Sequence, residues 1–164
     1  MSKYPNTKKE SFLDSIPTIS LDATDNDLSI RCKFNFSYFN VQDGISQSFS
    51  DWAEHELVKL LEKLKEYSKF SLEHWKRQTV GRYAVFAIYE QFPINTDFQQ
   101  PKFIPHQAEW GRFHLENTVR IIGFIVPHSY HDQLHPKTKT RYDRNTFYIV
   151  YLDRDHRFYK TDKS

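Results

Sequence analysis

The chain has 164 residues, of which 38% are hydrophobic and 16% aromatic, and its net charge is +2. This length suits one domain that buries a core without disulfides, and the single cysteine, Cys32, excludes an intramolecular disulfide. Because the net charge is small, it is no evidence for nucleic-acid binding by itself. Such evidence must come from where the charged residues lie. The lone cysteine and the lack of a long apolar run predict a cytoplasmic protein without membrane contact.

Residues 1–27 are polar and differ in character from the remainder of the chain. They predict a loosely ordered N-terminal lead-in, followed by one domain over residues 28–164. The lead-in carries an acidic patch and a few apolar residues that are candidates for docking on the domain: Asp22, Asp25 and Asp27, and Phe12, Leu13 and Ile16.

The first half of the domain shows a change of hydrophobic period. Alternation between Leu28 and Tyr38 predicts a half-buried strand with Cys32 in its buried register. Apolar residues then repeat at three and four from Ala53 to Leu64, which predicts a helix capped by Ser48 or Ser50. A second, shorter helix is expected to start at Ser71, with Leu72 and Trp75 facing inward.

The second half of the domain predicts strands at 82–90, 111–116, 119–126 and 146–152, with a short helix as the alternative for the first. The proline-rich run 91–109 is expected to be an irregular excursion. Asn117 and Thr118 predict a tight turn, which brings Arg112, His114 and Arg120 together if they share a face. The fold class is therefore α+β: a strand, two helices and then an antiparallel sheet of about four strands.

Basic residues gather between Pro127 and Asn145. Such a loop creates a local positive field that can track a phosphate backbone, or it is simply a mobile, solvated loop. The spacing of His128, His131 and His135 also resembles a set of metal ligands, but the flanking prolines oppose a regular helix and no cysteine is near, so no metal site is predicted. The cationic side chains expected to bind RNA here are Lys137, Lys139, Arg141 and Arg144.

Residues that can handle a phosphate stand at the start of one late strand and after the last one. Metal-free RNA cleavage needs a base for the 2′-hydroxyl and cations for the charged transition state. His156 can act as base or acid near neutral pH, and Tyr159 can stack on a splayed base. Arginine forks suit phosphate oxygens. The predicted catalytic residues, converging on one RNA phosphate, are Arg120, Arg154, His156 and Tyr159, with Arg112, His114 and Lys160 as further RNA-binding residues.

Structural roles are the alternative for these residues. Arg120 can pair with Glu116 across the predicted hairpin, and His156 can simply end a strand. Asp153 and Asp155 can neutralise neighbouring arginines, or they can orient His156.

The order of elements over residues 28–160, the segment Val119-Arg120-Ile121 and the terminal Arg154, His156 and Tyr159 together resemble the RelE/ParE superfamily of small bacterial toxins. The resemblance implies a toxin of a toxin–antitoxin module, an mRNA interferase that cleaves RNA, free or ribosome-bound, without metal or cofactor. It also implies a cognate antitoxin protein as partner. The chain is longer than a typical member, and relatives that lack the catalytic residues act on gyrase or only bind partners. The alternative is a non-enzymatic interaction module, such as an immunity or antitoxin-like protein or a phage-encoded binder, with an aromatic interface.

Overall fold

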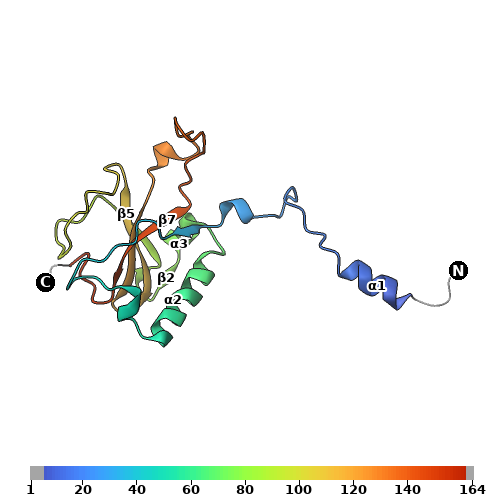
Figure 1. The fold of residues 1–164 in the computed structure, drawn as a ribbon, viewed down its shortest axis with the longest axis horizontal. Helices are drawn as coiled ribbons and strands as arrows, with labels where there is room; N and C mark the ends of the chain where they lie inside the picture. Colours follow the sequence, from blue (N-terminus) through green and yellow to red (C-terminus); the bar gives the residue numbers. More distant parts are fainter. Residues whose placement is uncertain (1–5, 162–164) are drawn as a thin grey trace.

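A five-stranded sheet forms the centre of the computed structural model, which describes residues 6–161 (Figure 1). The first five residues of the predicted lead-in therefore lie outside the described residues. The helices are α1 (Thr7–Asp14), α2 (Glu54–Tyr67) and α3 (Leu72–Arg77), with 3₁₀ turns at Leu28–Ile30, Phe49–Asp51 and His128–Tyr130. The strands are β1 (Lys33–Asn35), β2 (Thr79–Val80), β3 (Tyr83–Ala84), β4 (Phe86–Glu90), β5 (Glu109–Glu116), β6 (Val119–Ile125) and β7 (Thr146–Asp153).

The strand order is β1-β7-β6-β5-β4, and β2 and β3 form a separate two-stranded sheet. The predicted α+β class, with a strand and two helices before the main sheet, is confirmed. The predicted antiparallel sheet of about four strands is not, because β1 pairs parallel to β7 and makes the sheet mixed. Asn145 explains this pairing: its Nδ2 donates to Ile30 O at 2.9 Å and its Oδ1 accepts from Leu72 N at 3.0 Å. The start of β7 thus holds the entry to β1 beside it.

The first strand is much shorter than predicted. Only Lys33–Asn35 is strand, and Ile30 and Phe36, expected on the buried face, are 57% and 40% exposed. The side chain of Asn35 accepts a hydrogen bond from Ser37 N at 2.8 Å, a local turn that ends the strand. Cys32 is buried as predicted, at 3% exposure, and burial raises the pKa of its thiol to about 12.

Helices α2 and α3 cover one face of the sheet and build the larger apolar core. Leu60, Leu64 and Tyr67 of α2 pack there, and Leu72 and Trp75 of α3 are buried as predicted. The aromatic rings of this core include Phe34, Phe86, Phe113 and Phe147 from the strands.

The two helix starts differ in how well they were predicted. Ser71 caps α3 as expected, since its Oγ accepts a hydrogen bond from His74 N. The predicted serine cap of α2 is wrong: the helix begins after Ala53, whose N–H donates to Glu56 Oε2 at 2.8 Å. Ser48 instead starts the preceding 3₁₀ turn, where its N–H donates to Asp51 Oδ2.

Irregular segments cover the opposite face of the sheet. Between Gln91 and Ala108 the chain has no helix or strand, as predicted for the proline-rich excursion. Phe98 and Ile104 of this excursion and Phe158 near the C-terminus pack on Trp110 and Tyr151 of the sheet. This cover is apolar over the middle of the face and gives way to buried polar residues near the β5–β6 turn.

The described part of the lead-in extends away from the domain (Figure 1). Phe12, Leu13 and Ile16 are 65%, 52% and 44% exposed, so the docking on the domain expected of them is not formed. Over residues 6–161, none of the helices is both long enough and apolar enough to cross a membrane.

Candidate functional site

A row of three buried polar side chains crosses the sheet beside the β5–β6 turn. His114 on β5 pairs in register with Arg120 on β6, which pairs with Asp153 on β7. Their side chains are only 4%, 5% and 0% exposed. Because residues two apart in a strand share a face, Arg112 lies on the same face as His114. Burying ionisable groups costs free energy unless they are paired. A buried set of this kind is therefore a candidate functional site.

The β5–β6 turn holds Arg120 in place. Asn117 and Thr118 form the turn as predicted, and Asn117 has the positive φ of 46° that asparagine tolerates. The Nη1 of Arg120 donates back to Asn117 O at 2.7 Å and to Val119 O at 2.9 Å. The alternative pairing of Arg120 with Glu116 is absent, since Glu116 pairs with Lys59 at 3.3 Å.

Neither Arg112 nor Arg120 forms an ion pair in the described part of the chain, although the charge of the neighbouring Asp153 acts on Arg120. Among residues 6–161, neither guanidinium has a carboxylate within 4 Å. Burial, and then the charge of Arg112, lower the pKa of Arg120 to about 10, which leaves it charged at neutral pH. Arg112 donates to Ala84 O at 3.0 Å, whereas the buried Nε of Arg120 has no hydrogen-bond partner. Two positively charged side chains thus lie close together, and one N–H donor, the Nε–H of Arg120, has no acceptor among the described residues.

Two histidines lie within the field of these arginines. Burial, followed by the charges of Arg120 and Arg112, lowers the pKa of His114 to about 4. Burial and the charge of Arg120 also lower the pKa of His156, although Asp153 opposes this. Both imidazoles are therefore neutral at pH 7 and can accept a proton. The buried Nδ1 of His114 has no partner. We call Arg112, His114, Arg120 and His156 the arginine–histidine cluster.

Asp153 shapes the loop that carries His156. Its buried carboxylate accepts the backbone N–H groups of Arg157 at 3.0 Å and Phe158 at 2.9 Å, and burial raises its pKa. His156 occupies the left-handed region with φ 57°, a conformation that costs energy for a residue with a Cβ and persists only where its surroundings impose it. Asp153 therefore holds the backbone of the loop that carries His156, and among the described residues it forms no ion pair with Arg154.

An aromatic pair borders the cluster. Tyr159, 41% exposed, stacks on Tyr89 with ring centroids 4.8 Å apart and an interplanar angle of 8°. Burial raises the pKa of Tyr89, while the charge of Arg112 and a hydrogen bond from it oppose the rise. Tyr83 stacks on His114 with centroids 5.7 Å apart. Aromatic faces thus flank the arginines.

The structure does not bring Arg154 to the other three predicted catalytic residues. Successive residues of a strand point to opposite faces, so Arg154 leaves the face that Asp153 occupies. Its Nη2 donates to Asp51 O at 2.9 Å and lies 3.3 Å from Glu56 Oε2, and its guanidinium lies 5.6 Å from the centre of the Trp52 ring. Arg154 therefore belongs to the helix-covered side of the sheet.

The basic loop lies at the other end of the sheet. It connects the end of β6 to the start of β7 and projects from the domain (Figure 1). Lys137 and Lys139 are exposed, Arg141 lies 3.6 Å from Asp132, and Arg144 pairs with Glu109 at 3.0 Å. Lys160 is likewise apart from the cluster and pairs with Asp97. Among the described residues, no three His, Cys, Asp or Glu side chains gather to hold a metal ion.

Sequence reasoning missed Tyr83 and Tyr89. In the structure, antiparallel pairing of β4 with β5 sets Ala87 opposite Arg112, and Tyr89 lies two residues further along β4. The irregular register between Ile88 and Glu90 conceals which face Tyr89 occupies when only the sequence is known.

Comparison of the chain with protein-family models, with curated proteins and with solved structures gave no significant match.

Proposed function

We propose that this protein is a metal-independent endoribonuclease whose arginine–histidine cluster binds and cleaves RNA. The observation that carries the proposal is that Arg112 and Arg120 act on each other with no carboxylate of residues 6–161 within 4 Å, beside two imidazoles of lowered pKa. Anions relieve such a concentration of like charge, and guanidinium forks suit the oxygens of a phosphodiester. Among residues 6–161 the buried Nε–H of Arg120 has no hydrogen-bond partner, so an anion that reaches it would supply the missing acceptor.

His156 is the proposed general base. In its neutral form it takes the proton of the 2′-hydroxyl, whose oxygen bonds to phosphorus as the bond to the 5′-oxygen breaks and that oxygen takes a proton from solvent. Arg120 and Arg112 stabilise the added negative charge on the phosphorus oxygens. The exposed face of Tyr159, backed by Tyr89, offers a platform for an unpaired base.

The wider proposal is a RelE-like toxin of a toxin–antitoxin module, silenced by a cognate antitoxin. The order of a strand, two helices and a final sheet supports it, together with Arg120, His156 and Tyr159 around one site. Arg154 is removed from the proposed catalytic set because of its contacts with Glu56 and Asp51.

The direct test is an RNA cleavage assay with EDTA present, using single-stranded RNA and, separately, ribosome-bound mRNA. We expect fragments with 2′,3′-cyclic phosphate and 5′-hydroxyl ends, and no cleavage of DNA of the same sequence, which lacks the 2′-hydroxyl. His156→Gln and Arg120→Gln should lose activity, whereas Arg154→Gln is the matched control that should keep it. Intact RNA in both substrates, or full activity in His156→Gln, contradicts the proposal.

Expression in bacteria tests the toxin role. The wild-type chain should arrest growth, and His156→Ala should relieve the arrest at equal protein level. Harmless expression of soluble wild-type protein favours the non-enzymatic interaction module instead.

A further inference from the structure

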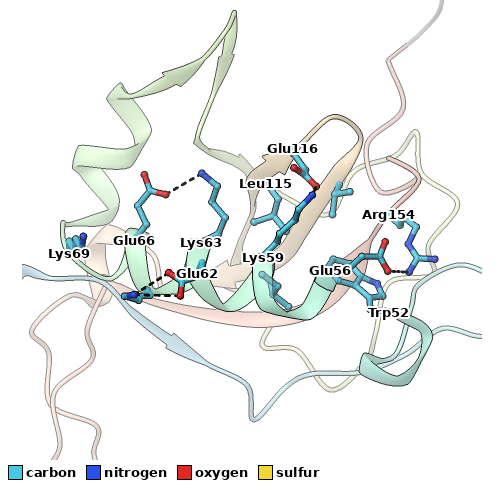
Figure 2. Close-up of a pocket in the computed structure, with 13 residues that line it drawn as sticks. Trp52, Glu56, Lys59, Glu62, Lys63, Glu66, Lys69, Leu115, Glu116 and Arg154 are labelled. Carbon is cyan, nitrogen blue, oxygen red and sulfur yellow. Dashed lines mark hydrogen bonds and ion pairs between the residues drawn. The ribbon is translucent and has the colours of Figure 1, made fainter. Parts of the chain in front are cut away.

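A groove of about 500 Å³ runs along α2, between this helix and the β5–β6 hairpin (Figure 2). Its apolar lining comes from Trp52, Leu60, Leu115 and Val119. Lysines and glutamates of α2 line it as well. Each of its four glutamates is already in an ion pair with a basic neighbour, and the groove holds five basic residues, so the charge of Lys69 is left over.

One end of the groove holds two donors without acceptors. The indole Nε1 of Trp52 and the Nε of Arg154 are buried and have no hydrogen-bond partner among the described residues. Trp52 as a whole is 7% exposed. A buried donor left unpaired is destabilising. An occupant that brings oxygen atoms to this end would remove that cost.

Residues 6–31 form an arm with many exposed apolar side chains, which the groove could bind. Its large apolar side chains are between 44% and 90% exposed: Phe12, Leu13, Ile16, Ile19, Leu21, Leu28 and Ile30. Among residues 6–161, the hydrogen bonds of residues 6–29 stay within the arm, so no hydrogen bond holds these residues on their own domain. So much exposed apolar surface in one segment indicates a binding surface.

The charges of the arm complement those of the groove. Residues 14–27 contain four aspartates and no lysine or arginine. Among residues 6–161, only Asp27 of these is in an ion pair, with Arg31. Asp14 and Asp22 flank the apolar Ile16, Ile19 and Leu21, so the segment combines apolar side chains with the oxygen atoms that a groove with lysines and unpaired donors requires.

We propose that residues 14–27 of one copy of this chain bind in the α2 groove of a second copy, which gives a reciprocal dimer. The direction of the arm favours a second copy over its own domain. The arm joins the domain beside the Lys69 end of the groove, where Cys32 N donates to Phe70 O at 2.8 Å, but it then leads away from the domain and not along α2 toward Trp52 (Figure 1). If each copy places its arm in the groove of the other, the two contacts are related by a twofold axis, and both arms and both grooves are occupied.

Sedimentation equilibrium of the full chain tests the dimer. We expect dissociation into monomers on dilution and, for the arm variant with Ile19→Asp and Leu21→Asp, a dissociation constant raised at least about tenfold. Ile94→Asp is the matched control, since Ile94 is fully exposed and lies outside arm and groove. A wild-type chain that is monomeric at every concentration overturns the proposal, and so does a dimer that the arm variant leaves intact.

A mixing experiment separates exchange between copies from binding within one copy. The groove variant with Lys63→Glu and Lys69→Glu should likewise have a dissociation constant raised at least about tenfold. Mixed with the arm variant, it should form dimers that retain one intact contact. Absence of mixed dimers, with the wild-type arm still protected from proteolysis, would mean that the arm binds its own domain and would overturn the exchange.

The indole resonances report on the groove directly. We expect the Nε1–H signal of Trp52 to shift between the wild-type dimer and the arm variant in ¹H–¹⁵N spectra. The signal of Trp75 should stay in place, because its Nε1 already donates to Tyr67 O at 2.7 Å. An unmoved Trp52 signal contradicts occupation of this groove. The nuclease assay plays no part in these readouts, so either proposal can fail alone.

Discussion

Two regions of the molecule gather basic side chains, and they differ in burial. The basic loop between Pro127 and Asn145 has more cations, but its lysines are exposed and its arginines lie beside Asp132 and Glu109. The arginine–histidine cluster has only two arginines, yet Arg120 is 5% exposed and neither has an acidic partner within 4 Å. Exposed charges are screened by water and salt, while buried ones are not. The number of charges is therefore a poorer guide to a phosphate site than their burial.

The supporting structure separates the regions as well. Arg112, His114 and Arg120 stand on paired central strands, and Asp153 holds the loop of His156. The basic loop lies outside the main sheet and is held by its own contacts, which include an isolated bridge between Leu134 and Arg141 and a hydrogen bond from Asp132 N to Tyr142 O at 2.9 Å. Chemistry requires groups that are fixed relative to one another, which central strands provide.

The largest effect is expected for loss of the proposed base. His156→Gln should lower the cleavage rate by about 10²–10⁴ and leave RNA affinity nearly unchanged, because a neutral side chain replaces a neutral imidazole. Single-turnover kinetics and a filter-binding assay measure the two quantities separately. If cleavage and affinity fall together, His156 binds RNA or supports the fold and is not the base.

The next largest effect is expected for RNA affinity, where the loss of a buried cation is compared with the loss of an exposed one. Arg120→Gln should weaken RNA binding by about 10- to 100-fold, the range for charge-assisted hydrogen bonds in a buried site. Lys139→Gln should weaken it only a few-fold and reduce the slope of affinity against salt by about one. Titrations at several salt concentrations decide this, with thermal unfolding to show that Arg120→Gln is folded. Equal losses from both variants would remove the distinction between the regions.

The part of this contrast that was predictable from sequence is the part set by local pattern. Alternation and the Asn117 turn predicted that Arg112, His114 and Arg120 come together if they share a face, and the register of β5 and β6 meets that condition. The same pattern could not place Arg154, because its position depends on where β7 ends and on contacts with Asp51 and Glu56 on a distant segment.

Burial also depends on the tertiary fold. The parallel pairing of β1 and the path of residues 91–108 over the sheet are long-range outcomes, which no hydrophobic period encodes. For that reason the sequence alone does not distinguish the exposed lysines of the loop from the buried Arg120.

Acid should destabilise the cluster through His114. Its pKa falls from 6.5 to about 4 on folding, so the unfolded chain binds the proton more readily. The stability that neutral His114 provides is present above pH 6.5 and is lost as the pH falls toward 4, by about 1–2 kcal/mol between pH 7 and pH 5. Urea denaturation of wild type and His114→Gln should show a difference that shrinks or reverses on acidification. The same replacement at the exposed His55 provides the control, and a pH-independent difference for His114 would contradict its burial in neutral form.

The smallest expected effect is a shift in the pH dependence of cleavage, which tests whether the charges of the cluster alter one another's pKa values. The positive charge of Arg112 is one of the causes that lower the pKa of His156. A general base must be unprotonated, so the acid limb of kcat/KM reports this pKa, and Arg112→Gln should move the limb to higher pH by a few tenths of a unit. Arg144→Gln removes an equal charge that is paired with Glu109 in the other region, and it should leave the limb in place. A shift to lower pH in Arg112→Gln, or an equal shift in both variants, would mean that the limb reflects total charge and not the local field around His156.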